Sequence, residues 1–150
     1  MTLKERITDD MKAALRAGEK ERLSAIRLIL AAVKQKEVDE RITVDDAQLL
    51  GVLEKMIKQR RESIAQFESG GRADLVAKES AELALLQSYL PVQLGAAEVD
   101  ALIDEAIRTS GASSLKDMGK VMASVKAKAQ GRTDMGALSA RVKQKLGAPS

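Results

Sequence analysis

The sequence lacks the residues on which most enzyme chemistry depends. Its 150 residues include no cysteine, no histidine and no tryptophan, and only one phenylalanine and one tyrosine. The absence of cysteine and histidine excludes a disulfide, a thiolate nucleophile, a histidine proton shuttle and an ordinary zinc site. Any catalysis would therefore have to use carboxylates, lysine, serine or threonine.

The residues that are abundant favour helices. Alanine, leucine, lysine, glutamate and arginine make up 78 of the 150 residues, and all five are strong helix formers. The scarcity of aromatic residues leaves little material for half-buried strands. No apolar run approaches the roughly 18 to 20 residues that span a bilayer, and the polar start of the chain is unlike a signal peptide. We expect an all-α, soluble, cytoplasmic protein that makes no contact with membranes.

Residues 1–94 carry the pattern of four helices joined by short loops. Thr2 and Glu5 have the spacing of a capping box that begins the first helix, and Gly18 is placed to end it. Thr43 is expected to cap the third helix, while Pro91 ends the fourth. An antiparallel four-helix bundle is predicted. After the first, its helices are expected over residues 19–36, 43–67 and 73–88.

Residues 95–150 differ in charge and in helix length. The first 94 residues hold 16 basic and 16 acidic side chains, whereas residues 95–150 hold 9 and 6, so the whole net charge of +3 lies in the second part. Three shorter helices are indicated there by apolar stripes, with Ser114 and Asp117 spaced as a capping box for the second of them. We therefore predict a small C-terminal three-helix domain after residue 94.

The charges of the second part are also segregated along the chain. Residues 95–110 carry four acids against Arg108, whereas residues 116–145 carry eight bases against Asp117 and Asp134. At 100° per residue the bases fall outside the apolar stripes, and such a surface attracts polyanions. The candidate nucleic-acid-binding residues are Lys116, Lys120, Lys126, Lys128, Arg132, Arg141, Lys143 and Lys145.

Other interpretations of the charged residues stay open. The lysines could serve only to solvate the helix surfaces. Arg60 and Arg61 form a second donor set, for which pairing within the helix, as between Lys58 and Glu62, is the competing interpretation. The acids at 37–40 and 100–105 are better explained as turns and helix starts than as metal ligands. We predict no catalytic residue, no metal site and no cofactor. The scarcity of aromatics favours folded or double-helical RNA over a single strand.

Three segments in order resemble the GatB/YqeY family: RLSAIRLILAAVKQKE (residues 22–37), KQRRESIAQFESGGRADLVAKESAELALLQSYLP (58–91) and DMGKVMASVKAKAQGRTD (117–134). The resemblance implies a two-part helical protein. GatB is a subunit of a glutamine-dependent tRNA amidotransferase, and its similar helical and tail portion engages tRNA. The resemblance places Lys120, Lys126, Lys128 and Arg132 in the tail-like segment, and it supplies no catalytic residue.

Three functions are therefore carried forward. The first is a non-catalytic protein, expected as a monomer, that binds tRNA or associates with an amidotransferase or other translation proteins. The second is a protein–protein interaction module that does not bind RNA. The third, implied by the family, is carbon–nitrogen ligase activity with glutamine as the amido-nitrogen donor, which would require partner subunits. On its own the chain is not expected to be an enzyme.

Overall fold

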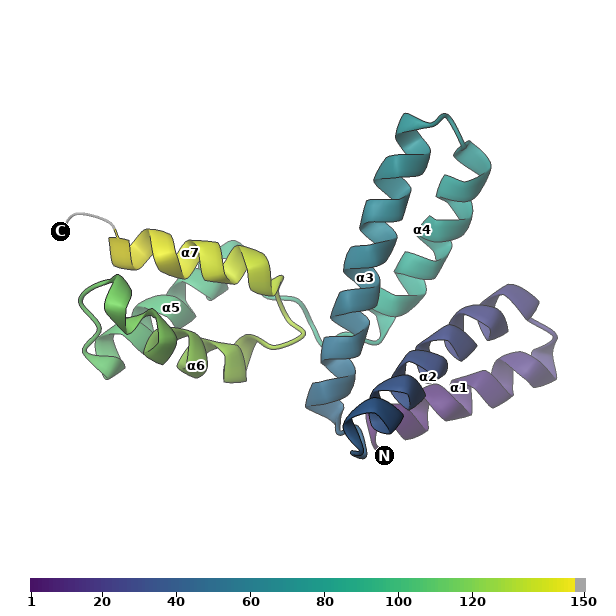
Figure 1. Cartoon of the computed structure of the whole chain (residues 1–150), viewed down its shortest axis with the longest axis horizontal. Coiled ribbons are helices and arrows are strands. Elements are labelled where there is room, and N and C mark those ends of the chain that lie inside the picture. Colours follow the sequence, from purple (N-terminus) through teal and green to yellow (C-terminus); the bar gives the residue numbers. More distant parts are fainter. Residues whose placement is uncertain (148–150) are drawn as a thin grey trace. The chain divides into compact units, whose positions relative to one another are not determined.

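The computed structural model describes residues 1–147, which form seven α-helices and one short 3₁₀ helix. Within this range there is no β-strand (Figure 1). The prediction of an all-α protein is therefore confirmed. Residues 148–150, at the end of the predicted C-terminal domain, lie outside the described residues.

The chain divides into two compact units, one from Met1 to Leu90 and one that begins at Pro91. Each unit has a hydrophobic core of its own, and Leu94 packs against the second core. The fully buried side chains of the first core include Ile7, Ile26, Ile29, Leu49 and Leu53, and those of the second include Ile103, Val121 and Val142.

Helices α1 (Leu3–Ala17) and α2 (Lys20–Glu40) form an antiparallel hairpin. The expected capping box is present, because the Glu5 amide donates to Thr2 Oγ1 at 3.1 Å and the Thr2 amide donates to Glu5 Oε2 at 2.9 Å. Helix α2 continues beyond its predicted end. It stops at Arg41, which takes a left-handed conformation with φ of 54° although it is not glycine.

Helices α3 (Asp46–Ser69) and α4 (Ala73–Ser88) form a second hairpin. Its reversal uses Gly71, whose φ of 70° is readily available only to glycine. The prediction of a Thr43 cap for α3 is wrong. The cap is Asp45, whose carboxylate accepts from the Gln48 amide at 2.8 Å while Gln48 Oε1 accepts from the Asp45 amide.

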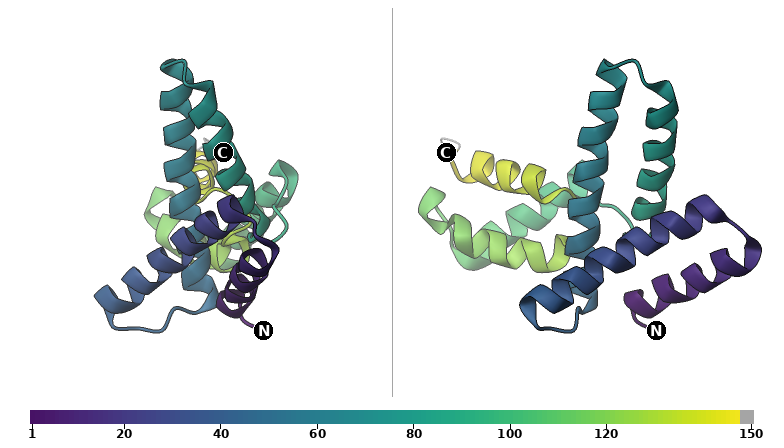
Figure 2. Two further views of the ribbon diagram at one scale, coloured as in Figure 1. Left: turned by 90° about the vertical axis from the view of Figure 1, so that its right-hand side faces the viewer. Right: turned by 45° about the vertical axis from the view of Figure 1, so that its right-hand side comes forward.

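The two hairpins of the first unit meet at one end and diverge, so the aligned four-helix bundle expected from the sequence is not confirmed (Figures 1 and 2). The far end of the α3–α4 hairpin stands clear of α1 and α2 in these views. From Lys58 to Leu85 no side chain is buried. Two helices alone cannot enclose a core, which explains the partial exposure of the apolar side chains there.

The second unit contains α5 (Ala96–Ser110), the 3₁₀ helix η1 (Leu115–Asp117), α6 (Met118–Ala129) and α7 (Met135–Gly147). The predicted capping box at Ser114 and Asp117 is not formed. Ser114 Oγ accepts from the Lys116 amide and caps η1, and Asp117 accepts from the Ser113 amide. Because η1 precedes it, α6 begins only at Met118.

Candidate nucleic-acid interface

Helix α6 places its lysines on solvent-facing sides because its other side is buried. Val121, Val125 and Ala129 recur every four residues and are fully buried in the second core. On a helix, Lys120 then lies opposite this stripe, and Lys126 and Lys128 flank it. All three lysines are exposed. The apolar stripe therefore fixes the outward placement of the basic residues.

Five of the eight predicted binding residues are exposed lysines, called here the five lysines. The ion pairs that join side chains within residues 91–147 involve Arg141 and Lys145 instead. No ion pair joins the five lysines to an acid in the part of the chain that the structure describes, although Lys120 lies near Asp117 and helps to lower the pKa of that carboxyl. They are Lys116, Lys120, Lys126, Lys128 and Lys143.

Arg141 and Lys145 bind acids of α5. Arg141 Nε donates to Asp100 Oδ1 at 2.8 Å and its Nη2 donates to Asp100 Oδ2 at 3.0 Å. One turn further along, Lys145 Nζ lies 2.7 Å from Asp104 Oδ1. The hydrogen bond from Arg141 lowers the pKa of Asp100, and the same bond raises the pKa of Arg141. These two bases connect α7 to α5.

Arg132 binds the first residues of the second unit, which precede α5. Its Nε donates to the carbonyl of Val92 at 3.0 Å, and its own carbonyl accepts from the Leu94 amide at 2.7 Å. Gln93 Nε2 also donates to the carbonyl of Gly131 at 2.7 Å. Arg132 therefore holds residues 92–94 against the turn between α6 and α7.

Arg60, from the second predicted donor set, pairs across the α3–α4 hairpin. Its Nε lies 3.0 Å from Glu82 Oε2 and its Nη1 lies 3.2 Å from Glu79 Oε2. The latter oxygen is buried and has no hydrogen bond of good geometry, so its contact with Arg60 is electrostatic. Arg61 is exposed. The partners of Arg60 thus lie on the neighbouring helix α4 and not within α3.

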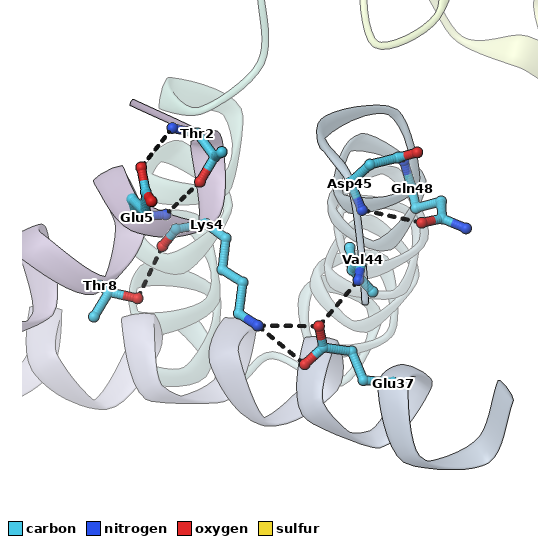
Figure 3. A network of polar contacts seen from close by, with 8 residues as sticks. All are labelled: Thr2, Lys4, Glu5, Thr8, Glu37, Val44, Asp45 and Gln48. Atoms are coloured by element: carbon cyan, nitrogen blue, oxygen red, sulfur yellow. Dashed lines mark hydrogen bonds and ion pairs between the residues drawn. The ribbon is translucent and has the colours of Figure 1, made fainter. Parts of the chain in front are cut away.

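The acids near residue 37 belong to a structural network (Figure 3). Both carboxylate oxygens of Glu37 accept from Lys4 Nζ, at 3.0 and 3.1 Å, and Oε2 also accepts from the Val44 amide at 3.0 Å. The Val44 amide and Lys4 lower the pKa of Glu37. One side chain therefore links α1, α2 and the segment that leads into α3. Within residues 1–147 no group of three or more acidic side chains is arranged to hold a metal ion.

A recess of the first unit lies beside this network. It is an open groove of about 710 Å³ between the starts of α1 and α3. Its lining carries both signs of charge, and several of its acids already cap helices or accept backbone hydrogen bonds. The lining residues are Thr2, Lys4, Glu5, Thr8, Asp9, Lys12, Thr43, Val44, Asp45 and Asp46.

None of the helices within residues 1–147 combines the length and the apolar character needed to cross a membrane.

Two similar proteins from fungi bear the same name, "Altered inheritance of mitochondria protein 41, mitochondrial". The protein of Pyrenophora tritici-repentis is 32% identical over 149 residues, which cover 95% of this chain and 80% of the relative. That of Eremothecium gossypii is 40% identical over 116 residues, covering 73% of this chain and 63% of the relative. The chain thus spans less than two thirds of the second protein.

These relatives contradict the expected cytoplasmic location, because both are named mitochondrial proteins. They agree with the resemblance found in the sequence. A family model described as "Yqey-like protein" matches residues 4–146, nearly the whole chain. The chain therefore belongs to the Yqey-like protein family.

Proposed function

We propose that this chain is a non-catalytic tRNA-binding protein, and that residues 95–150 act as the RNA-binding domain. The observation that carries the proposal is the set of five exposed lysines, none of them in an ion pair within the described residues, on a unit whose sequence has a net charge of +3. Lysine ammonium groups bind phosphate as point charges, and phosphate contacts supply most of the affinity in nonspecific nucleic-acid binding.

A folded RNA fits this surface better than an unpaired strand. Proteins that bind single strands stack bases on aromatic rings, and residues 95–150 contain no aromatic residue. Of the two aromatics elsewhere, Tyr89 is buried and donates to Asp10. A double-helical or folded RNA presents closely spaced phosphates instead, which is what point charges recognise.

The proposal assigns no chemistry to the chain. Acyl transfer and amide formation need a positioned nucleophile or general base, and the carboxylates with lowered pKa are held by backbone amides, lysine or arginine in structural roles. We propose that any carbon–nitrogen ligase activity associated with the family requires a partner, such as an amidotransferase, with this chain as the RNA-binding component.

A protein-binding role is the second candidate, and one observation favours it. The end of the α3–α4 hairpin, residues 58–85, has no buried side chain and presents half-buried Ile64, Phe67 and Leu75. A partner protein could cover these side chains. Binding there would be independent of the lysines of the second unit, so the two functions can be separated by mutation.

The experiment compares two variants of equal charge. In the first, the five lysines are changed to glutamate. In the matched control, five exposed lysines of the first unit are changed in the same way: Lys12, Lys20, Lys34, Lys55 and Lys78. Affinity for labelled tRNA is measured by fluorescence anisotropy at low salt, and helicity by circular dichroism.

The proposal expects the first variant to lose at least about tenfold in affinity while the control loses much less, because phosphate contact is local to the second unit. Equal losses would mean that only net charge matters and would contradict the assignment. An absence of binding by the unmodified protein would reject RNA binding and leave the protein-binding role.

A further inference from the structure

We propose that the RNA is bound independently of its base sequence. Lysine side chains alone make the contact, and they bind the phosphates of a double-helical region. This inference rests on the proposed function. Its basis is the way the second unit uses its arginine and glutamine side chains, which are the groups that could otherwise read bases.

Base reading requires particular side chains. Arginine or lysine can bind guanine, and asparagine or glutamine recognises adenine by paired hydrogen bonds. In double-helical RNA the deep, narrow major groove keeps a lysine away from these base edges, so its contacts there are with phosphates. The sequence contains no asparagine. In the second unit, paired hydrogen bonds to bases would therefore have to come from arginine or glutamine side chains.

The arginines of the second unit are unsuited to this task. Arg141 already makes a two-point contact with Asp100, the geometry it would need for guanine. The guanidinium of Arg132 donates to the Val92 carbonyl. Arg108 is exposed, but it follows Asp104 and Glu105 on α5 within one turn, so a polyanion approaching it meets two carboxylates.

The glutamines are engaged as well. Gln144 Oε1 accepts from Arg141 Nη1 at 2.8 Å, and Gln93 Nε2 donates to the Pro91 and Gly131 carbonyls. Gln130 also has an interaction partner. The strong cationic donors left exposed near α6 are therefore lysines, which bind phosphate without regard to the base attached to it.

The same arrangement defines which side of the unit faces RNA. Arg141 and Lys145 lie one turn apart on the flank of α7 that meets the acids of α5. Lys143 is two residues from Arg141, a rotation of about 200°, so it lies on the opposite flank. The lysines of η1, α6 and this flank of α7 form the contact surface, which curves around α6 because Lys126 and Lys128 are also two residues apart and lie on its opposite flanks. The face of α5 that carries Asp100 and Asp104 lies outside this surface.

Four RNAs test the inference: two tRNA transcripts of unrelated sequence, a duplex RNA of about 20 base pairs and a single-stranded oligoadenylate of similar length. Equilibrium competition against one labelled tRNA gives their relative affinities. We expect the affinities for the two tRNAs and the duplex to agree within about threefold, whereas a protein that reads sequence would separate them by about a thousandfold or more. The single strand should bind more weakly, because the second unit has no aromatic ring on which its bases could stack.

Two single variants locate the contact. Lys120→Ala should weaken binding to every RNA by a similar factor and reduce the slope of log affinity against log salt by about one. Arg108→Ala, which removes the same charge from α5, should leave both quantities unchanged.

The outcomes separate this inference from the proposed function. A preference of more than about tenfold for one tRNA, or equal binding of oligoadenylate, would overturn sequence-blind duplex recognition while tRNA binding itself stood. Loss of affinity on Arg108→Ala without loss on Lys120→Ala would overturn the assigned surface. Failure of all four RNAs to bind would reject the proposed function and this inference with it.

Discussion

Arg141 and Asp100 join α7 to α5 by two parallel hydrogen bonds, 2.8 Å from Nε to Oδ1 and 3.0 Å from Nη2 to Oδ2. The acid occupies the position that a phosphate would take on this arginine. Lys145 and Asp104 repeat the relationship one turn further along, at 2.7 Å. Two of the bases that the sequence assigned to RNA binding are thus neutralised within the protein.

Freeing Lys145 tests which flank of α7 faces the RNA. We expect Asp104→Asn to change the affinity for tRNA and the salt dependence no more than its control does, because Lys145 lies on the flank of α7 that meets α5, away from the proposed contact surface. The control is Glu105→Gln, which removes an exposed charge from the next residue of α5 without freeing Lys145. Anisotropy titrations at several salt concentrations measure both quantities. A larger gain in affinity and a steeper salt dependence in Asp104→Asn than in the control would contradict this placement of the contact surface.

Arg60→Ala should destabilise the first unit. It leaves Glu79 and Glu82 without their shared arginine partner, with side chains only 15% and 17% exposed, and unpaired charged groups of this kind cost about 1 to 3 kcal/mol. Arg61→Ala is the control, since that side chain is exposed and its loss should change stability by less than about 0.5 kcal/mol. Urea unfolding measures the difference. Equal stabilities of the two variants would show that the ion pairs contribute nothing.

Tyr89→Phe should cost about 1 kcal/mol, because the buried Tyr89 hydroxyl donates to Asp10 Oδ2 at 2.7 Å and the ring is retained. Tyr89→Ala should cost about 3 to 5 kcal/mol, because it also removes the ring from the core. The guanidinium carbon of Arg6 also lies over the Tyr89 ring, 5.2 Å from the ring centre. Thermal unfolding of both variants tests the ranking. If the phenylalanine variant is as unstable as the alanine variant, packing of the ring is not the larger contribution.

Stability should change little between about pH 5.5 and 9, because the chain has no histidine or cysteine to titrate there. Four carboxyls have a lowered pKa in the folded protein, and each contributes stability above its unfolded value of about 4 that is lost as the pH falls through the folded pKa. The main cause in each case is a hydrogen bond to the carboxylate. The donor is the Val44 amide for Glu37 and the Ser113 amide for Asp117. It is the side chain of Arg72 for Asp74 and that of Arg141 for Asp100. The four are Glu37, Asp74, Asp100 and Asp117.

The alkaline limit has the opposite sign. Burial and the hydrogen bond to Asp10 raise the pKa of Tyr89, so its contribution is complete below the unfolded value of about 10 and is lost as the pH rises towards the folded pKa. Unfolding free energies measured from pH 2 to 11 should therefore decline at both ends. A stability transition between about pH 6 and 8 would contradict this description.

The sequence predicted the ends of a helix correctly where a single residue determines the backbone conformation at that end. Thr2 with Glu5 and Gly18 mark both ends of α1 correctly, because a cap and a left-handed turn each depend on a single side chain or its absence. The end of α2 was missed because Arg41 takes the left-handed conformation that the sequence rules reserve for glycine. The start of α3 was missed because Thr43 and Asp45 are both good caps and only the hydrogen bond to Gln48 distinguishes them.

The exposure of four of the five lysines followed from helical periodicity, since it depends only on the apolar stripe of their own helix. Lys116 is the exception, because it lies in η1, which has no buried residue. The roles of Arg60, Arg132 and Arg141 could not be predicted in that way. Their partners are on other helices or loops, Asp100 being 41 residues from Arg141 and Val92 being 40 residues from Arg132. Pairing between residues so far apart in the sequence depends on how the helices pack against each other. The periodicity of a single helix carries no information about that packing.

The salt dependence of tRNA binding tests the central claim most directly. If the five lysines each contact a phosphate, log affinity should fall with log salt at a slope of about −3.5 to −4.5, and the variant with all five changed to glutamate should lose both the affinity and most of the slope. The equally charged first-unit control should keep a slope close to that of the unmodified protein. A slope near zero, or an unchanged slope in the five-lysine variant, would contradict the assignment of this surface to RNA.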